Sequence, residues 1–598
     1  MHRSGTRTIL SPSDLVTHLG CAHATELDRR VLAGELARPS VHDADLEVLR
    51  RRGDEHERAQ LALFTEAGLS VVEITCRGSD VGDLRAAEAE TLAAMRAGAD
   101  VVFQATFFDG RWRGAADFLL KVARPSDLGA WSYEVADTKL ARRVKPSALV
   151  QLCAYAEQVA RLQGVWPEEL VVITGDGEHH RSRTADVVAY HRRVKEQLES
   201  SVDGPLEPTE AVPVEHCGVC PWASRCKEGW RAADSLRLIA GVRSTAVAPL
   251  AGAGITAGAA LAASADGTPV EGMRVEVVDR LRRQARLQLA QRTDGVVRHE
   301  LLVPERLEDP EDRAGPLAVD PAPDQAPPAP RGLAALPTPS TGDLFFDIEG
   351  DPWVGPNGIE YLFGVVEGPT SGGALPRYTA YWGHDPAGER QAFEQLVDLV
   401  VARLDADPGM HVYHYAPYER TVLQRLAGRY GTRHAEVDRI LRGKVLVDLY
   451  RVVRHAILVS QEGYGLKKLE PLYLPPDARS GEAVTDGGSS IAVYEEWLET
   501  RDPARLEEIR AYNEVDCRST LGLRDWLEER RAELERRTGA PLPRPAGAEG
   551  AASTAVSALD ARQEAAVGAL LAGVPEDPAA RGPDVEVQRL LADLVGWH

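Results

Sequence analysis

Residues 344–350 read LFFDIEG, and this stretch sets the expected fold of the C-terminal half of the chain. A short apolar run that includes two acids spaced two residues apart is typical of a buried strand at the start of an α/β domain. Side chains alternate along a strand, so Asp347 and Glu349 point to the same face of the sheet. Paired carboxylates of this kind offer the oxygen ligands that Mg²⁺ binds.

Two later acids can join that pair. MHVYHYAPYERTVLQRLA is typical of a strand followed by a helix, with Glu419 at the helix start. In RAYNEVDCRSTLGLRDWL, Tyr512 and Asp516 lie one helical turn apart. Acids from one strand and two helices would hold two Mg²⁺ or Mn²⁺ ions about 3.5–4 Å apart, which clamp the attacking and leaving oxygens of a phosphodiester. Asp448, in VLVDLYRVV, is a reserve ligand.

The order of these motifs resembles the RNase H-like, DnaQ-type exonucleases of the DEDDy kind, which a YprB-type domain also represents, over residues 341–535. The resemblance implies an RNase H-like fold in which Tyr512 orients the attacking water. It implies that the metal ligands are Asp347, Glu349, Glu419 and Asp516. One departure is that the second motif of the family ends in Asp, whereas Glu419 is a methylene longer.

A second group of acids lies in the N-terminal part. WRGAADFLLKV and WSYEVADTKLA are typical of paired strands, and Asp137 and Lys139 share one face of the second strand. Asp117 can meet them across the pair, whereas Glu134 points to the opposite face. Two carboxylates beside a lysine suit metal-dependent phosphodiester hydrolysis, because the acids hold the ion and the ammonium steadies the transition state. A surface hairpin with an Asp–Lys ion pair is the alternative.

The neighbouring motifs favour the hydrolytic interpretation. Gly-x-x-His, Asp, Asp-x-Lys, Gln-x-x-x-Tyr and Cys-x2-Cys-x5-Cys follow one another in an order that resembles the RecB-like PD-(D/E)XK nucleases with an iron–sulfur clasp. The resemblance implies a restriction-endonuclease-like fold over residues 1–232. It implies that the metal ligands are His56, Asp117 and Asp137, that Lys139 is catalytic, and that Gln151 and Tyr155 support the site.

The clasp would need four ligands. Cys217, Cys220 and Cys226 supply three, and the family places the fourth far upstream, where Cys21 stands. Four thiolates suit a 4Fe–4S cluster or Zn²⁺, and with zinc His216 or His23 could replace a cysteine. The remote fourth ligand favours the cluster. The remaining thiols are expected in cores: Cys76, Cys153 and Cys517.

Length and composition are those of an α/β multidomain protein. Residues 235–303 are expected to form a helical spacer, with a limited resemblance to helix-hairpin-helix elements that grip the DNA backbone. Residues 304–340 form a Pro-rich acidic linker, because ten prolines fall within 304–339. Residues 536–598 are expected to be a flexible or truncated tail.

The charge and the termini bear on partners and location. A net charge of −22 argues against a protein that coats nucleic acid by bulk electrostatics, but acidic nuclease sites are neutralised by metal. The chain has neither a signal core nor an apolar run long enough for a membrane, so we expect a cytoplasmic protein with no membrane partner.

Together these patterns predict exonucleolytic processing of DNA in repair or recombination. An RNA-processing exonuclease and a nucleic-acid-binding scaffold with inactive sites are the alternatives. The two-nuclease order resembles RecB-like putative nucleases whose longer members continue into a superfamily-one helicase. Since no G-x-x-x-x-G-K-[ST] loop occurs here, the helicase part is absent, and the chain is a truncated form or works with a helicase in trans.

Overall fold

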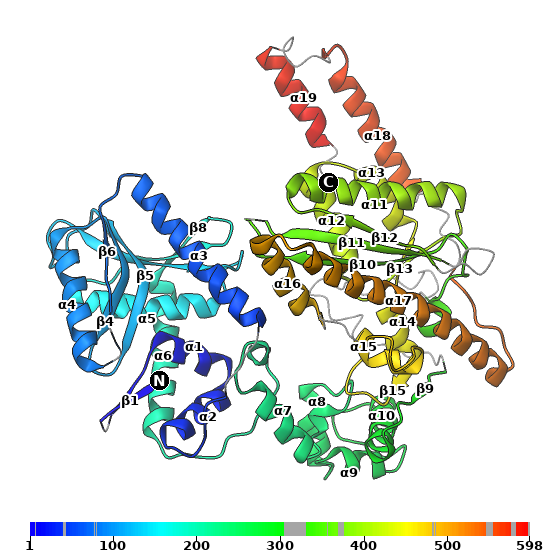
Figure 1. Cartoon of the computed structure of the whole chain (residues 1–598), viewed down its shortest axis with the longest axis horizontal. Coiled ribbons are helices and arrows are strands. Elements are labelled where there is room, and N and C mark those ends of the chain that lie inside the picture. Colours follow the sequence, from blue (N-terminus) through cyan, green and yellow to red (C-terminus); the bar gives the residue numbers. More distant parts are fainter. Residues whose placement is uncertain are drawn as a thin grey trace.

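In a computed structural model the chain forms three successive units, and Figure 1 shows the first and third side by side with the second below them. No helix among the described residues has the length and apolar character needed to cross a bilayer. The structure describes residues 1–5, 7–39, 44–76, 78, 80–303, 330–355, 357–368, 376–480, 484, 486–545, 554–575 and 582–595.

The N-terminal unit is built on a six-stranded mixed sheet of order β3-β4-β5-β6-β7-β8. Apolar side chains alternate along its central strands, so Leu119 and Val135 pack against helix α5 while Phe118 and Ala136 lie in the cluster on the other face, next to α3. Its elements are β1 (His2–Ser4), β2 (Arg7–Ile9), α1 (Pro12–Gly20), α2 (Ala22–Leu32), α3 (Ala44–Glu66), β3 (Val71–Glu73), α4 (Val81–Ala97), β4 (Val101–Phe108), β5 (Arg113–Val122), β6 (Ser132–Lys139), α5 (Pro146–Gln163), β7 (Glu169–Thr174), β8 (His179–Arg183), α6 (Thr184–Asp203), η1 (Glu215–Gly218) and α7 (Ala223–Ala232).

The middle unit is helical, as expected. Leu250, Leu261 and Leu281 form part of its small buried core. After the last helix, a short strand leaves this unit and pairs antiparallel with a strand of the third unit. The elements are η2 (Leu236–Leu238), α8 (Ser244–Gly252), α9 (Gly258–Ala263), α10 (Val275–Asp294) and β9 (His299–Leu301), whose partner is β15 (Ile457–Val459).

The third unit has a five-stranded sheet of order β12-β11-β10-β13-β14. The first three strands along the chain are antiparallel, and β13 and β14 continue the sheet in parallel with β10. Helix α17 crosses one face and α11 covers the other (Figure 1). The elements are η4 (Gly332–Ala335), β10 (Leu344–Asp351), β11 (Ile359–Glu367), β12 (Tyr378–Trp382), α11 (Pro386–Ala406), β13 (Val412–His414), α12 (Tyr418–Tyr430), α13 (His434–Arg442), β14 (Leu446–Asp448), α14 (Leu449–Ala456), α15 (Leu466–Leu469), η5 (Glu470–Leu472), α16 (Gly487–Thr500), α17 (Pro503–Thr538), α18 (Thr554–Leu571) and α19 (Pro583–Val595).

Three expectations differ from the structure. The linker was expected to reach residue 340, but Leu333 and Leu336 are buried in the core of the third unit, because their side chains complete the apolar face under α14 and α17; residues 304–329 lie outside the described residues. The tail, which was expected to be flexible or truncated, contains α18 and α19, which pack on each other. Cys76 was expected in a core and is exposed, since it follows the short edge strand β3.

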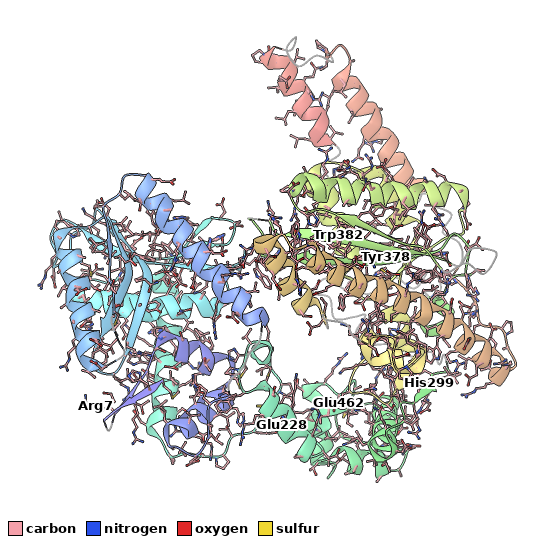
Figure 2. The ribbon with its side chains drawn as sticks, viewed as in Figure 1. Arg7, Glu228, His299, Tyr378, Trp382 and Glu462 are labelled. Atoms are coloured by element: carbon pink, nitrogen blue, oxygen red, sulfur yellow. The ribbon has the colours of Figure 1, made fainter. Side chains whose placement is uncertain are left out.

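Charged contacts join the units. Arg51 and Arg52 of α3 both reach Glu495 of α16, at 3.0 and 2.6 Å, and Glu495 is 3% exposed. Arg231 of α7 pairs with Glu462 at 3.2 Å, and Figure 2 labels Glu462 between the middle and third units. The first and third units are therefore in direct contact and not only tethered through the middle one.

Candidate active site

Alternation along β10 decides which acids face the active-site side of the sheet. Leu344, Phe346 and Ile348 pack into the core under α11 and α12. The intervening Asp347 and Glu349 therefore point to the opposite face, which α17 covers. The sequence-predicted strand and the shared face of the two acids are both present.

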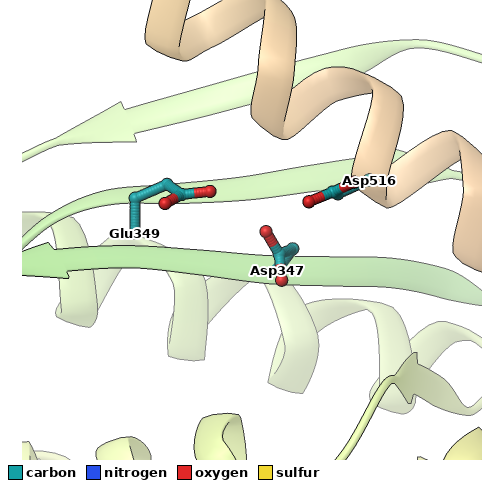
Figure 3. A group of neighbouring side chains, drawn as sticks. All are labelled: Asp347, Glu349 and Asp516. Atoms are coloured by element: carbon teal, nitrogen blue, oxygen red, sulfur yellow. The ribbon is translucent and has the colours of Figure 1, made fainter. Parts of the chain in front are cut away.

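Three carboxylates converge between that strand and α17. Asp347, Glu349 and Asp516 each offer an oxygen that lies within 4.8 Å of the others, and Figure 3 shows them grouped between β10 and α17. Within the described residues this is the group of acids, histidines or cysteines whose spacing suits a metal ion. Carboxylate oxygens from a strand and a helix are the ligands that Mg²⁺ and Mn²⁺ prefer.

The three carboxylates of this group repel one another. Burial, followed by the charges of Glu349, Asp516 and Glu419, raises the pKa of Asp347 well above its ordinary value. Burial and the charge of Asp516 raise the pKa of Glu349 to about 8. Anions held together away from water are stabilised when a cation binds between them, so the electrostatics of the group favour a divalent ion.

Asn513 fixes the orientation of Asp347. Its side-chain amide donates to Asp347 at 2.9 Å and its carbonyl oxygen accepts from the Tyr378 hydroxyl at 2.9 Å. Tyr378 and Trp382 mark the two ends of β12 in Figure 2. Gly364, directly across from Asp347 on β11, leaves the space for the amide, because a Cβ there would lie 1.6 Å from the Asn513 oxygen.

Two cations that the sequence did not single out reach the helix face of the site. Lys467 donates to the Tyr512 hydroxyl at 2.8 Å and lies over its ring. Arg479 pairs with Asp516 and with Glu470. Burial and the nearby carboxylates, Asp516 first, raise the pKa of Tyr512. Neither cation belongs to a recognisable motif, and only the fold brings them to the acids.

Glu419 lies at the start of α12, 3% exposed, where its carboxylate accepts from His414 at 3.2 Å. Its charge acts on Asp347, but it stands outside the group of three. Asp448, the reserve ligand, caps α14 by accepting from the backbone N–H of Tyr450 at 2.9 Å. Asp448 therefore has a structural role at a helix end.

A model of the RNase H superfamily matches residues 344–528. This part of the chain is an RNase H-like domain. No curated protein matches the chain. An RNase H-like domain with a group of acids suited to Mg²⁺ or Mn²⁺ indicates a metal-dependent nuclease.

The N-terminal candidates also come together in part. Lys139 pairs with Asp137, which is 2% exposed. Asp117 accepts from the backbone N–H and the hydroxyl of Thr138, at 2.8 and 2.7 Å, next to Asp137. Burial, then the charge of Asp117, raises the pKa of Asp137 to about 7. Two acids and a lysine therefore share one end of β6, as the spacing predicts.

His56, a predicted metal ligand, lies beside strand β7, which is next to β6. Its Nε2 lies 3.4 Å from the carbonyl oxygen of Ile173, the residue paired with Thr138. Its neighbour Glu57 also lies near the acids, since burial and the charge of Asp117 raise the pKa of Glu57 to about 7. Glu57 also accepts from Gln104, whose φ of 54° interrupts the pairing of β4 with β5 opposite Asp117. Successive residues of a helix point about 100° apart, so a residue next to His56 can also reach the sheet. Glu57 was not singled out from the sequence.

Gln151 and Tyr155 lie one turn apart on α5, as expected. Tyr155 is 6% exposed, and burial and then the charge of Asp137 raise its pKa. The ring packs so closely on β5 that a Cβ at Gly114 would lie 2.7 Å from it. Glu134, on the other face of β6, pairs with Arg181 at 3.4 Å.

The four clasp cysteines line one small pocket. Cys21, between α1 and α2, meets Cys217, Cys220 and Cys226 there, with His216 and His23 also in the lining. Burial and the charges of the other thiols raise the pKa values of Cys220 and Cys226. Four thiols around one pocket are the type of donor that an iron–sulfur cluster or Zn²⁺ uses. Cys153 and Cys517 are buried, as predicted for core thiols.

Proposed function

We propose that this protein is a metal-dependent exonuclease that processes DNA ends in repair or recombination, with hydrolysis in the RNase H-like domain. The convergence of Asp347, Glu349 and Asp516 within 4.8 Å carries the proposal. Bound Mg²⁺ or Mn²⁺ ions would activate water and neutralise charge on the scissile phosphate. The choice of DNA rests on the resemblance of the N-terminal motifs to RecB-like nucleases.

The side chains of this site would have separate roles. Asp347, Glu349 and Asp516 would hold the ions, with Glu419, whose charge acts on Asp347, as the fourth ligand. Tyr512, whose hydroxyl accepts from Lys467 at 2.8 Å, orients the attacking water. Asn513 keeps the Asp347 carboxylate aimed at the group, because its amide donates to one oxygen and leaves the other for an ion.

The N-terminal unit supplies a second nuclease site in this proposal. His56, Asp117 and Asp137 would bind a divalent ion, with Glu57 as a further carboxylate close by, and Lys139 would steady charge on the phosphate. The four cysteines would hold a 4Fe–4S cluster that ties Cys21 to the far end of the unit, with zinc as the other group that four thiolates suit. A helicase acting in trans and a cytoplasmic location complete the proposal.

The test is degradation of end-labelled single- and double-stranded DNA and of matched RNA, with Mg²⁺ or Mn²⁺. Asp347→Asn and Lys139→Ala are assayed separately, against the exposed control variants Asp438→Asn and Lys121→Ala. We expect DNA to be degraded from its ends, and each site variant to lose the share of activity that its site supplies. Cleavage at the wild-type rate in both site variants would contradict the proposal, and cleavage of RNA alone would replace DNA by RNA as the substrate.

A further inference from the structure

A large basic cavity lies outside both candidate nuclease sites. It has a volume of about 620 Å³ and opens between the helices α8 and α10 of the middle unit and α14 of the RNase H-like domain. This volume falls in the range of about 300–1,000 Å³ that encloses a ligand of nucleotide size. Five arginines line it, and the described lining contains no Asp or Glu: Arg243, Arg274, Arg280, Arg451 and Arg454.

The absence of acids from this lining contrasts with the rest of the same helix. On α10, Arg283 pairs with Glu300 at 2.6 Å and Arg286 with Asp266 at 2.8 Å. Within the described part of the chain, Arg451 and Arg454 form no ion pair with a carboxylate. In a protein of net charge −22, a concave surface whose charged lining, within the described residues, consists of arginines concentrates positive potential and attracts polyanions.

Aromatic rings complete the lining. Tyr450 and Tyr464 both face the cavity, and the guanidinium of Arg454 lies 5.1 Å from the centre of the Tyr464 ring. Arg280 donates to the backbone carbonyl of Arg454 at 2.6 Å, which ties the middle unit to α14. Guanidinium groups beside tyrosine rings are the combination that holds a phosphate backbone and stacks its bases without reading their sequence.

The cavity wall is continuous with the acidic site. The Tyr415 hydroxyl donates to the carbonyl oxygen of Tyr464, and three residues after Tyr464 the side chain of Lys467 donates to Tyr512. Tyr415 also lies against Tyr450, with ring centres 5.7 Å apart. The segment 464–467 therefore runs from the basic cavity to the residue proposed to orient the attacking water.

We infer that this cavity binds the sugar–phosphate backbone of an unpaired nucleic-acid strand whose end lies in the RNase H-like site. The choice of ligand rests on the proposed function, and the site itself rests on the arginine and tyrosine lining. The cavity admits a segment of nucleotide size and not a duplex, so binding favours single strands. Specificity for the base is absent, because the arginines contact phosphates.

The test is anisotropy of a fluorescein-labelled single-stranded oligonucleotide in EDTA, over a series of salt concentrations. Arg243→Gln combined with Arg451→Gln removes two exposed positive charges from opposite walls. The control combines Arg96→Gln with Arg536→Gln, which removes the same charge from exposed positions on α4 and α17. We expect the cavity variant to bind about tenfold more weakly and the slope of log K against log salt to fall by about 1.4, at about 0.7 per lost phosphate contact.

Each outcome decides the inference. Equal binding by the cavity and control variants overturns it, and so does displacement of the strand by a low concentration of a nucleoside monophosphate, which would make the cavity a mononucleotide site. Circular dichroism confirms that the variants are folded, and single Arg451→Gln provides a milder second variant. Cleavage in Mn²⁺ is measured separately: a wild-type protein that binds through the cavity but does not cleave contradicts the proposed function and leaves the binding site standing.

Discussion

The side-chain amide of Asn513 is held 2.9 Å from the Asp347 carboxylate, in a space that exists because residue 364 carries no side chain. The strand β11 thus supports the acidic group, because Gly364 has no Cβ that would displace the Asn513 amide. Asn513 is fully buried, and its carbonyl oxygen is also bonded to Tyr378, so the amide has no other position to take without losing a buried hydrogen bond.

Gly364→Ala should therefore disable the RNase H-like site. The new methyl group would displace Asn513 and free Asp347 to turn, which costs about 1–3 kcal/mol of stability from overpacking and about 10–100-fold in activity from loss of the supporting bond. Chemical denaturation and nuclease assays measure the two effects. Gly428→Ala, at a helical position with nothing within 4 Å of the new atom, is the matched control. Full activity in Gly364→Ala would show that Asn513 does not orient Asp347.

Asp347→Asn should make the protein without metal more stable and less sensitive to metal. Removing one of three mutually repelling buried carboxylates relieves the repulsion that raises the pKa of Asp347. We expect the Tm in EDTA to rise, and Mg²⁺ or Mn²⁺ to raise the Tm of the wild type more than that of the variant, because the variant lacks the ion of the RNase H-like site. An equal metal-induced shift in both proteins would place the ion elsewhere.

Glu157 should contribute an acid-sensitive part of the stability of the N-terminal unit. Against the opposing effect of burial, hydrogen bonds from His191 and Lys195 lower the pKa of Glu157 to about 2. A carboxyl with a lowered folded-state pKa stabilises fully above its ordinary value of 4.5, and the contribution disappears as the pH falls toward 2. Glu157→Gln should lose about 1 kcal/mol at neutral pH and nothing in strong acid, as measured by urea denaturation.

The control for that experiment is Glu196→Gln, an exposed glutamate on the same helix as Lys195. It should leave the pH dependence of unfolding unchanged. A Glu157 variant with the same pH profile as the wild type would mean that the contacts of 2.6 Å to Lys195 and 3.4 Å to His191 are offset by desolvation.

Cys21→Ser should release the metal group from all four cysteines. Protein purified without oxygen is expected to be brown, with bound iron and a broad visible absorption band, and the variant should be colourless and less stable. Cys76→Ser, at an exposed thiol outside the pocket, should keep the colour. Stoichiometric zinc without iron in the wild type would exclude the cluster and leave the nuclease proposal unaffected.

The sequence predicted those pairs of site residues that lie on one face of a single strand or helix. Asp347 with Glu349, Tyr512 with Asp516 and Gln151 with Tyr155 follow from the periods of a strand and a helix. The strand and the helix that carry the acidic group were each recognisable, and their convergence required only that both belong to one α/β domain. The RNase H-like assignment of this region rests on the same residues.

Contacts between elements distant in sequence were not predictable. Arg479 reaches Asp516 from a loop, and Gly364 matters only because β11 lies beside β10. Glu57 was not singled out beside His56, because only the position of α3 over the sheet brings the Glu57 carboxylate near Asp117. Of the two C-terminal helices, the stretch ALDARQEAAVGALLAG already indicates α18, whereas α19 was missed because an Ala-, Pro- and Gly-rich composition does not reveal where a helix starts.

The pairing of β9 with β15 has a consequence for the integrity of the molecule. Leu301 lies opposite Ile457, and the backbone N–H of Leu302 donates to the carbonyl oxygen of Ala456 at 2.8 Å. The chain before residue 304 is therefore held to the RNase H-like domain by backbone hydrogen bonds as well as by the covalent chain. A protease that cuts between residues 304 and 329 would leave two fragments that still elute together under native conditions. Size-exclusion chromatography under native conditions would therefore not detect such a cut, and only denaturation would separate the two fragments.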